Sequence, residues 1–120
     1  MPKLLIVDDE IDVREFARNF FKRRKINVET SSTGEEALAK LETQKPDLVI
    51  LDIRMEGIDG IEVLRRMREA GNKTDVIMVT GVNEQEFMDR ATELGAIGYI
   101  RKPLVLEELE KVVLNRILKK

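Results

Sequence analysis

The chain has 120 residues, the usual length of a single domain with one hydrophobic core. It contains no cysteine and no histidine, which excludes disulfides, thiolate or imidazole metal sites and histidine acid–base catalysis. Lys and Arg together number 21, and Asp and Glu number 23. A domain that binds nucleic acid directly would be basic, so direct nucleic-acid binding is not expected.

Strand-like and helix-like segments alternate from one end of the chain to the other. In chain order, the pattern predicts a strand over 3–7, a helix over 10–24, a strand over 27–31, a helix over 34–43, a strand over 48–51, a helix over 60–70, a strand over 76–79, a helix over 84–94, a strand over 97–101 and a helix over 105–118. Thr33, with Glu36 three residues later, predicts a capping box for the second helix. The first apolar run is too short for a signal peptide or a membrane span, so we expect a cytoplasmic protein without membrane contact.

These five strand–helix units predict one α/β domain over residues 1–120. Strands that are apolar on both faces and joined by helices form a parallel sheet covered on each side. The 27–31 strand alternates with polar residues, so it is expected at an edge. With right-handed crossovers and one reversal after that edge, the fold is a doubly wound, flavodoxin-like (βα)5 sandwich, with five parallel strands in the order 2-1-3-4-5.

Polar residues follow four of the predicted strands at the point where each strand ends. Asp8 and Asp9 follow the first strand, Asp52 the third, Thr80 the fourth and Lys102 the fifth. Ligands of open α/β sheets bind beyond the carboxyl ends of the strands, so we expect these side chains to meet there. Each has an ordinary explanation alone, such as a helix cap, a turn aspartate or an exposed lysine. Their joint placement favours a binding site.

Three neighbouring carboxylates repel one another unless one is protonated or a cation lies among them. Because only oxygen ligands are available, the sequence favours Mg²⁺, Mn²⁺ or Ca²⁺, and carboxylates with waters that complete an octahedron suit Mg²⁺. An aspartate carboxylate can attack phosphorus and form an aspartyl phosphate. The metal ion, the Lys102 ammonium and the Thr80 hydroxyl could then each take one phosphoryl oxygen. The sequence therefore predicts a site for a divalent cation and a phosphoryl group.

Five motifs surround these residues: Leu-Leu-Ile-Val-Asp-Asp-Glu, Leu-Asp-Ile-Arg-Met, Asp-Gly-Ile-Glu, Val-Thr-Gly and Gly-Tyr-Ile-Arg-Lys-Pro. Together they resemble the receiver domains of bacterial two-component response regulators, over essentially the whole chain. The resemblance implies a phosphoacceptor protein of signal transduction. Its phosphoryl group would come from a histidine on a sensor histidine kinase or a histidine phosphotransfer protein.

The resemblance also implies that Asp52 is the phosphoacceptor. Mg²⁺ would be bound by Asp9, Asp52 and the backbone carbonyl of Arg54, with Asp8 acting through water. One position departs from the family's pattern, because Glu56 stands where proline is common, four residues after the phosphoacceptor. We expect a less rigid loop there.

Movement on phosphorylation is a further implication of the resemblance. Lys102 would contact a phosphoryl oxygen, and its bond to Pro103 is expected to be cis. Thr80 would move to hydrogen-bond the phosphoryl group, and Tyr99 would rotate inward with it. Both movements would change a surface that binds an unknown downstream protein or a second copy of the chain. That surface comprises the helix at 84–94, the strand at 97–101 and the helix at 105–118.

The first helix is the candidate docking element for the phosphodonor. Ile11, Arg14, Glu15 and Arg18 lie on its less apolar side, just beyond the acidic pair. We expect them to contact the partner that carries the phosphohistidine. The alternative is that they form an ordinary solvated helix face.

Other classes of protein share part of the pattern. Phosphatases of the haloacid-dehalogenase type place the nucleophile after the first strand, with a second aspartate two residues on, where this chain has Arg54 after Asp52. A P-loop nucleotide binder requires Gly-x-x-x-x-Gly-Lys, which is absent. The main alternative is a pseudo-receiver, an interaction module that works without phosphorylation. We expect no turnover enzyme, and either a stand-alone receiver of the chemotaxis or phosphorelay type or part of a longer regulator.

Overall fold

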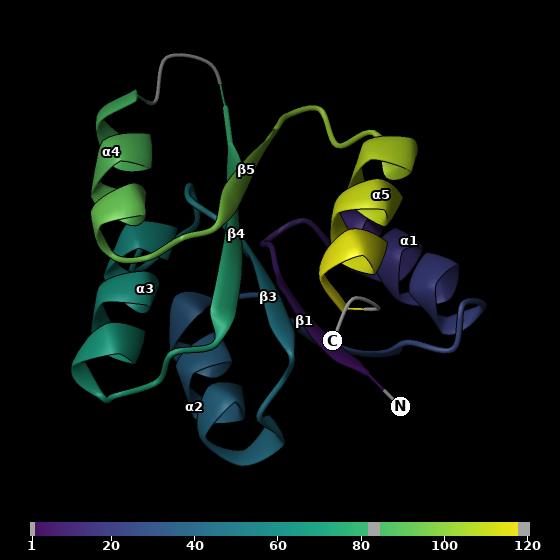
Figure 1. Cartoon of the computed structure of the whole chain (residues 1–120), viewed down its shortest axis with the longest axis horizontal. Helices are drawn as coiled ribbons and strands as arrows, with labels where there is room; N and C mark the ends of the chain where they lie inside the picture. The colour runs from purple at the N-terminus through teal and green to yellow at the C-terminus, as the bar shows by residue number, and fades with distance from the viewer. Residues whose placement is uncertain (1, 82–84, 118–120) are drawn as a thin grey trace.

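The computed structural model describes residues 2–81 and 85–117. Strands and helices alternate along this part of the chain (Figure 1). The strands are β1 (Lys3–Val7), β2 (Asn27–Ser31), β3 (Leu48–Asp52), β4 (Asp75–Thr80) and β5 (Gly98–Arg101). The helices are α1 (Ile11–Lys22), α2 (Gly34–Gln44), α3 (Gly60–Glu69), α4 (Gln85–Glu93) and α5 (Leu106–Ile117).

The strands form one parallel sheet in the order β2-β1-β3-β4-β5, which confirms the predicted topology and the edge position of β2. Helices α1 and α5 cover one face of the sheet, and α2, α3 and α4 cover the other (Figure 1). Val7 pairs with Leu51, and Asp52 pairs with Val79 in the next strand. Parallel pairing in this register brings the carboxyl ends of the central strands to a common edge.

Each face of the sheet has its own apolar core, because successive side chains of a strand point to opposite faces. Leu5, Val49 and Met78 pack toward α2, α3 and α4, whereas Leu4, Ile50 and Ile77 pack toward α1 and α5. Burial of each such side chain contributes about 1.5–3 kcal/mol. The central strands are therefore fixed on both sides, and this holds the residues at their ends in place.

The helix boundaries agree with the predictions to within one or two residues where the chain is described. At the start of α2, the Thr33 hydroxyl accepts the N–H of Glu36 at 3.1 Å, as predicted. The Glu36 carboxylate accepts the N–H of Ser32 at 2.9 Å, one residue before the usual partner in a capping box. The expected start of the fourth helix at residue 84 and the expected end of the fifth helix at residue 118 lie outside the described residues. Within the described ranges, no helix has both the length and the apolar character to cross a bilayer.

Candidate functional site

Two carboxylates are buried at the carboxyl edge of the sheet. Asp8 follows β1 and is 2% exposed, and Asp52 ends β3 and is 1% exposed. The Asp8 carboxylate accepts the N–H of Glu10 at 2.9 Å, and the Asp52 carboxylate accepts the N–H of Arg54 at 3.2 Å. These bonds orient both side chains from their own loops. Asp9 lies at the exposed rim of the same edge.

Lys102 reaches this edge from the end of β5. Its Nζ donates to Oδ2 of Asp52 at 2.8 Å, although the two residues lie 50 positions apart in the chain. The backbone N–H of Lys102 donates to the carbonyl of Thr80 at 2.8 Å, which fixes the root of the side chain. The Lys102–Pro103 peptide bond is cis, as expected. The structure thus brings the predicted carboxylate and ammonium into direct contact.

Burial governs the ionisation of the site. It raises the pKa of Asp8 from 3.8 to about 6, because the charged form loses solvation. Burial also raises the pKa of Asp52, and this outweighs the lowering by the hydrogen bond from Lys102. Burial alone would lower the pKa of Lys102, but the hydrogen bond and the charge of Asp52 raise it overall. The site therefore favours an added positive charge near Asp8 and Asp52.

The donor set suits a hard divalent cation. Carboxylate oxygens of Asp8, Asp9 and Glu10 lie within 4.8 Å of one another. The charge of Asp52 acts on Asp8, and that of Asp9 acts on Asp52, so all four carboxylates share one neighbourhood. Oxygen ligands of this kind fit Mg²⁺ or Mn²⁺, and a cation would offset the cost of ionising the buried pair. Glu10 was not among the predicted ligands, because its position before α1 suggested only a helix start.

Thr80 ends β4, where its carbonyl accepts the N–H of Lys102, and Tyr99 lies on β5. The Thr80 side chain is fully buried, and its hydroxyl has no hydrogen-bond partner among the described residues. The Tyr99 hydroxyl donates to the carbonyl of Met88 on α4 at 2.6 Å and also contacts the hydroxyl of Thr92. Tyr99 is thus held against α4 in this structure. A buried hydroxyl without a partner is costly, so the Thr80 side chain would gain from a hydrogen bond to an added group.

A loop over residues 53–59 connects Asp52, at the end of β3, to α3. Gly60 begins α3 and donates its N–H to the carbonyl of Ile53 at 2.8 Å. A Cβ at position 60 would lie 2.3 Å from the carbonyl oxygen of Asp52, so only glycine fits against this backbone. Gly57 has φ +78°, a left-handed conformation that also favours glycine. Glu56 is exposed in the same loop.

Two of the predicted docking residues on α1 also form hydrogen bonds within the fold. Ile11 is 62% exposed, which fits a docking role, but Arg14 donates to the carbonyl of Asp8 at 2.8 Å and Arg18 donates to the Thr30 hydroxyl at 2.8 Å. Both arginines therefore also support the fold. Phe16 recurs at helical spacing with the buried residues Ala17 and Phe21, yet it is 57% exposed.

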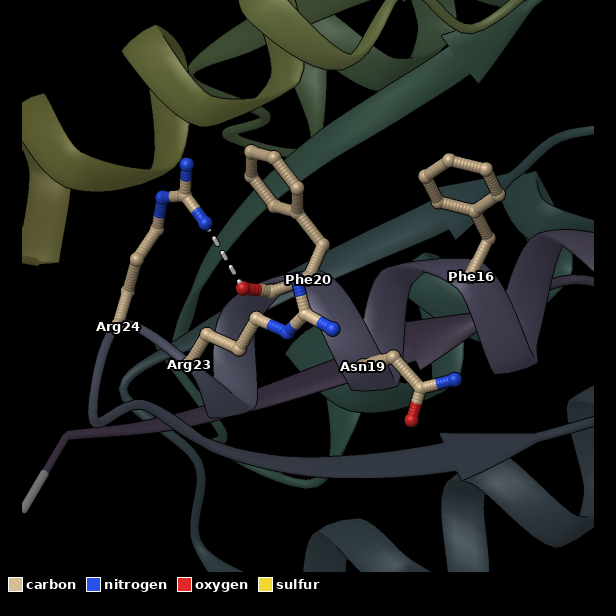
Figure 2. A pocket seen from close by; sticks show the side chains of 5 residues that line it. All are labelled: Phe16, Asn19, Phe20, Arg23 and Arg24. Carbon is tan, nitrogen blue, oxygen red and sulfur yellow. Dashed lines mark hydrogen bonds between the residues drawn. The ribbon is translucent and has the colours of Figure 1, made fainter.

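Phe16 opens onto a surface groove of about 440 Å³ along α1 (Figure 2). In this view the Phe16 and Phe20 rings lie on one side of the helix, and Arg24 donates to the carbonyl of Phe20 at 3.0 Å. A second hollow, of about 260 Å³, lies between α1 and the residues around α5 and includes Phe16 and Leu104. Periodicity could not identify this surface, because it does not show how much of the helix the neighbouring elements cover.

The chain is thus a doubly wound α/β domain with buried carboxylates and a lysine at the carboxyl edge of its parallel sheet. The family model of the response regulator receiver domain matches residues 4–114. The chain therefore belongs to the response regulator receiver domain family.

Several relatives place the chain within this family. It is 38% identical to the alkaline phosphatase synthesis transcriptional regulatory protein PhoP of Bacillus subtilis, over 95% of this chain and 49% of the relative. It therefore spans about half the length of that protein. It is 33% identical to sporulation initiation phosphotransferase F of Bacillus subtilis, over 92% of this chain and 90% of the relative.

Solved structures share the fold. The CheY-like receiver domain protein of Methanospirillum hungatei superposes with a TM-score of 0.92 at 27% identity, over 99% of this chain and 95% of that one. The chemotaxis protein CheY4 of Vibrio cholerae gives a TM-score of 0.89 at 30% identity, over 97% of this chain and 98% of that one.

Proposed function

We propose that this chain is a phosphoacceptor receiver of two-component signal transduction and that Asp52 accepts the phosphoryl group. The proposal rests on the buried Asp52 carboxylate, which accepts a hydrogen bond from Lys102 at 2.8 Å and lies beside Asp8 and Asp9. One Asp52 oxygen attacks phosphorus, and the bond between phosphorus and the donor's leaving group breaks. Lys102 is then placed to bond a phosphoryl oxygen.

Asp8, Asp9, Asp52 and the carbonyl of Arg54 are the groups proposed to hold Mg²⁺ or Mn²⁺, and Glu10 is close enough to contribute. The bound cation would supply positive charge to the phosphoryl oxygens. We do not assign a turnover activity, because the acceptor is a side chain of the protein itself. A cytoplasmic location follows from the proposed donors.

The proposed phosphodonor is a sensor histidine kinase or a histidine phosphotransfer protein, and α1 is its proposed docking surface. Ile11 and Phe16 supply exposed apolar contacts there, and Arg14 and Arg18 supply charge. Ile11→Ala and Phe16→Ala should slow transfer from a phosphorylated histidine kinase without slowing labelling by acetyl phosphate. Equal slowing with both donors would show that these residues support the structure of the domain and do not contact the kinase.

The proposed output surface is formed by α4, β5 and α5. Phosphorylation adds about −2 charge and new hydrogen-bond acceptors beside Thr80. When Thr80 bonds the phosphoryl group, Tyr99 is proposed to leave its contacts with Met88 and Thr92 and to turn inward. The exposed side chain of Ile97 and a hollow of about 380 Å³ beside Tyr99 would then change shape for a downstream protein or a second copy.

Intact-mass measurement after incubation with acetyl phosphate and Mg²⁺ tests the proposal. We expect one added phosphoryl group in the wild-type protein, and none in Asp52→Ala or in the presence of EDTA. The alternative is a pseudo-receiver that binds partners without phosphorylation. It would be supported if the wild type neither gains a phosphoryl group nor binds berylliofluoride.

A further inference from the structure

Arg54 and Phe87 connect the mouth of the acidic site to helix α4. Arg54 lies two residues after Asp52 and is exposed, whereas Phe87 lies on α4 and is partly buried against the core. The guanidinium carbon of Arg54 lies 5.0 Å from the centroid of the Phe87 ring. This distance is within the range of a cation–π contact, in which the positive charge is attracted to the face of the ring. The contact limits where the charge of Arg54 can lie.

The same two residues line a hollow of about 450 Å³ beside the acidic site. Three carboxylates also line it, those of Asp9, Glu56 and Asp59. Among the described residues of this lining, Arg54 alone is positively charged. An anionic phosphoryl donor that enters here is repelled by the carboxylates and attracted by the guanidinium. The guanidinium also presents its N–H groups as a planar fork, which matches phosphate oxygens.

We propose that Phe87 is a positioning residue for phosphoryl transfer, because its ring holds the Arg54 guanidinium at the mouth of the site, where it attracts the donor. This inference rests on the proposed function of Asp52. With acetyl phosphate as donor, an Asp52 oxygen bonds to phosphorus, the P–O bond to acetate breaks, and acetate leaves with the electron pair. Arg54 neither gives nor takes a proton in this step. Since Phe87 belongs to α4, a partner that displaces α4 also changes the approach of the donor.

A double-mutant cycle tests the inference with acetyl phosphate and Mg²⁺ as the reagents. Phe87→Leu should lower the second-order rate constant of labelling about two- to fivefold, which corresponds to about 0.5–1 kcal/mol for an exposed cation–π contact. Arg54→Met removes the charge but keeps the backbone carbonyl, and it should slow labelling at least as much. The double variant should match Arg54→Met, because Phe87 then has no charge to hold.

Two control variants separate positioning from packing. Phe87→Tyr keeps an aromatic face and should label at the wild-type rate. Leu94→Val alters a side chain that packs against the same core but is not part of the lining of the hollow, so it should leave the rate unchanged. The inference is overturned if Phe87→Leu labels at the wild-type rate or slows labelling equally in the Arg54→Met background. Wild-type protein that takes no label at all would instead overturn the proposed function, and this inference with it.

Discussion

The substitution Asp8→Asn should stabilise the metal-free protein at neutral pH. Asp8 is 2% exposed, and burial raises its pKa from 3.8 to about 6. Each pKa unit corresponds to about 1.4 kcal/mol, so ionised Asp8 costs the folded state about 3 kcal/mol. Asparagine has a similar shape and keeps an oxygen that can accept the N–H of Glu10. It removes the charge, and with it most of this cost.

The stabilisation by Asp8→Asn should depend on pH. Between pH 3.8 and about 6 the folded protein binds more protons at Asp8 than the unfolded chain does, so stability falls as the pH rises through this window. Asp8→Asn should therefore raise the free energy of unfolding by roughly 2–3 kcal/mol at about pH 7.5, and by less than about 1 kcal/mol at about pH 4.

Urea unfolding in EDTA, monitored by circular dichroism at both pH values, measures these differences. Added Mg²⁺ should reduce the difference in free energy of unfolding between Asp8→Asn and the wild type at neutral pH. The wild type binds the ion more tightly and therefore gains more stability. An equal gain at both pH values would show that the effect does not come from the charge of Asp8. A lower free energy of unfolding for Asp8→Asn at neutral pH would show that ionised Asp8 does not destabilise the folded state.

Three further substitutions probe the site. Lys102→Met removes the ammonium 2.8 Å from Asp52 and should slow labelling by acetyl phosphate about 100-fold or more, as followed by intact mass, with the circular dichroism spectrum unchanged. Thr80→Val deletes a buried hydroxyl that has no partner among the described residues, so urea unfolding should change by less than about 1 kcal/mol, whereas NMR signals of Tyr99 should no longer respond to berylliofluoride. Gly60→Ala places a Cβ 2.3 Å from the Asp52 carbonyl oxygen and should lower the free energy of unfolding by about 1–3 kcal/mol or more in urea.

Most of the architecture could be predicted because apolar runs and turn residues alternate regularly. The strand order followed from the polar alternation of β2 and from the handedness of crossovers. The convergence of Asp8, Asp52, Thr80 and Lys102 followed from one rule, that the ends of parallel strands share an edge. These features depend on backbone topology, which a periodic pattern encodes well.

The features that escaped prediction depend on how individual side chains lie in the fold. Phe16 has core spacing, but it is exposed because the neighbouring elements leave this part of α1 uncovered. Arg14 suggested a surface cation, yet it bonds the carbonyl of Asp8. The Glu10 carboxylate lies close to those of Asp8 and Asp9, and Arg54 contacts the Phe87 ring. Tertiary packing of the loops and of α4 produces both contacts. Sequence spacing carries no direct signal for such contacts.

Chemical mapping of the phosphoryl group shows whether the side chain of Asp52 is the acceptor, as we propose. Borohydride reduces an acyl phosphate to an alcohol, so labelling with acetyl phosphate and Mg²⁺, reduction and peptide mass mapping mark the acceptor. We expect homoserine at position 52 alone, and none without Mg²⁺. Homoserine at position 8 or 9, or no conversion in a protein that is folded and bound to Mg²⁺, would show that Asp52 is not the acceptor.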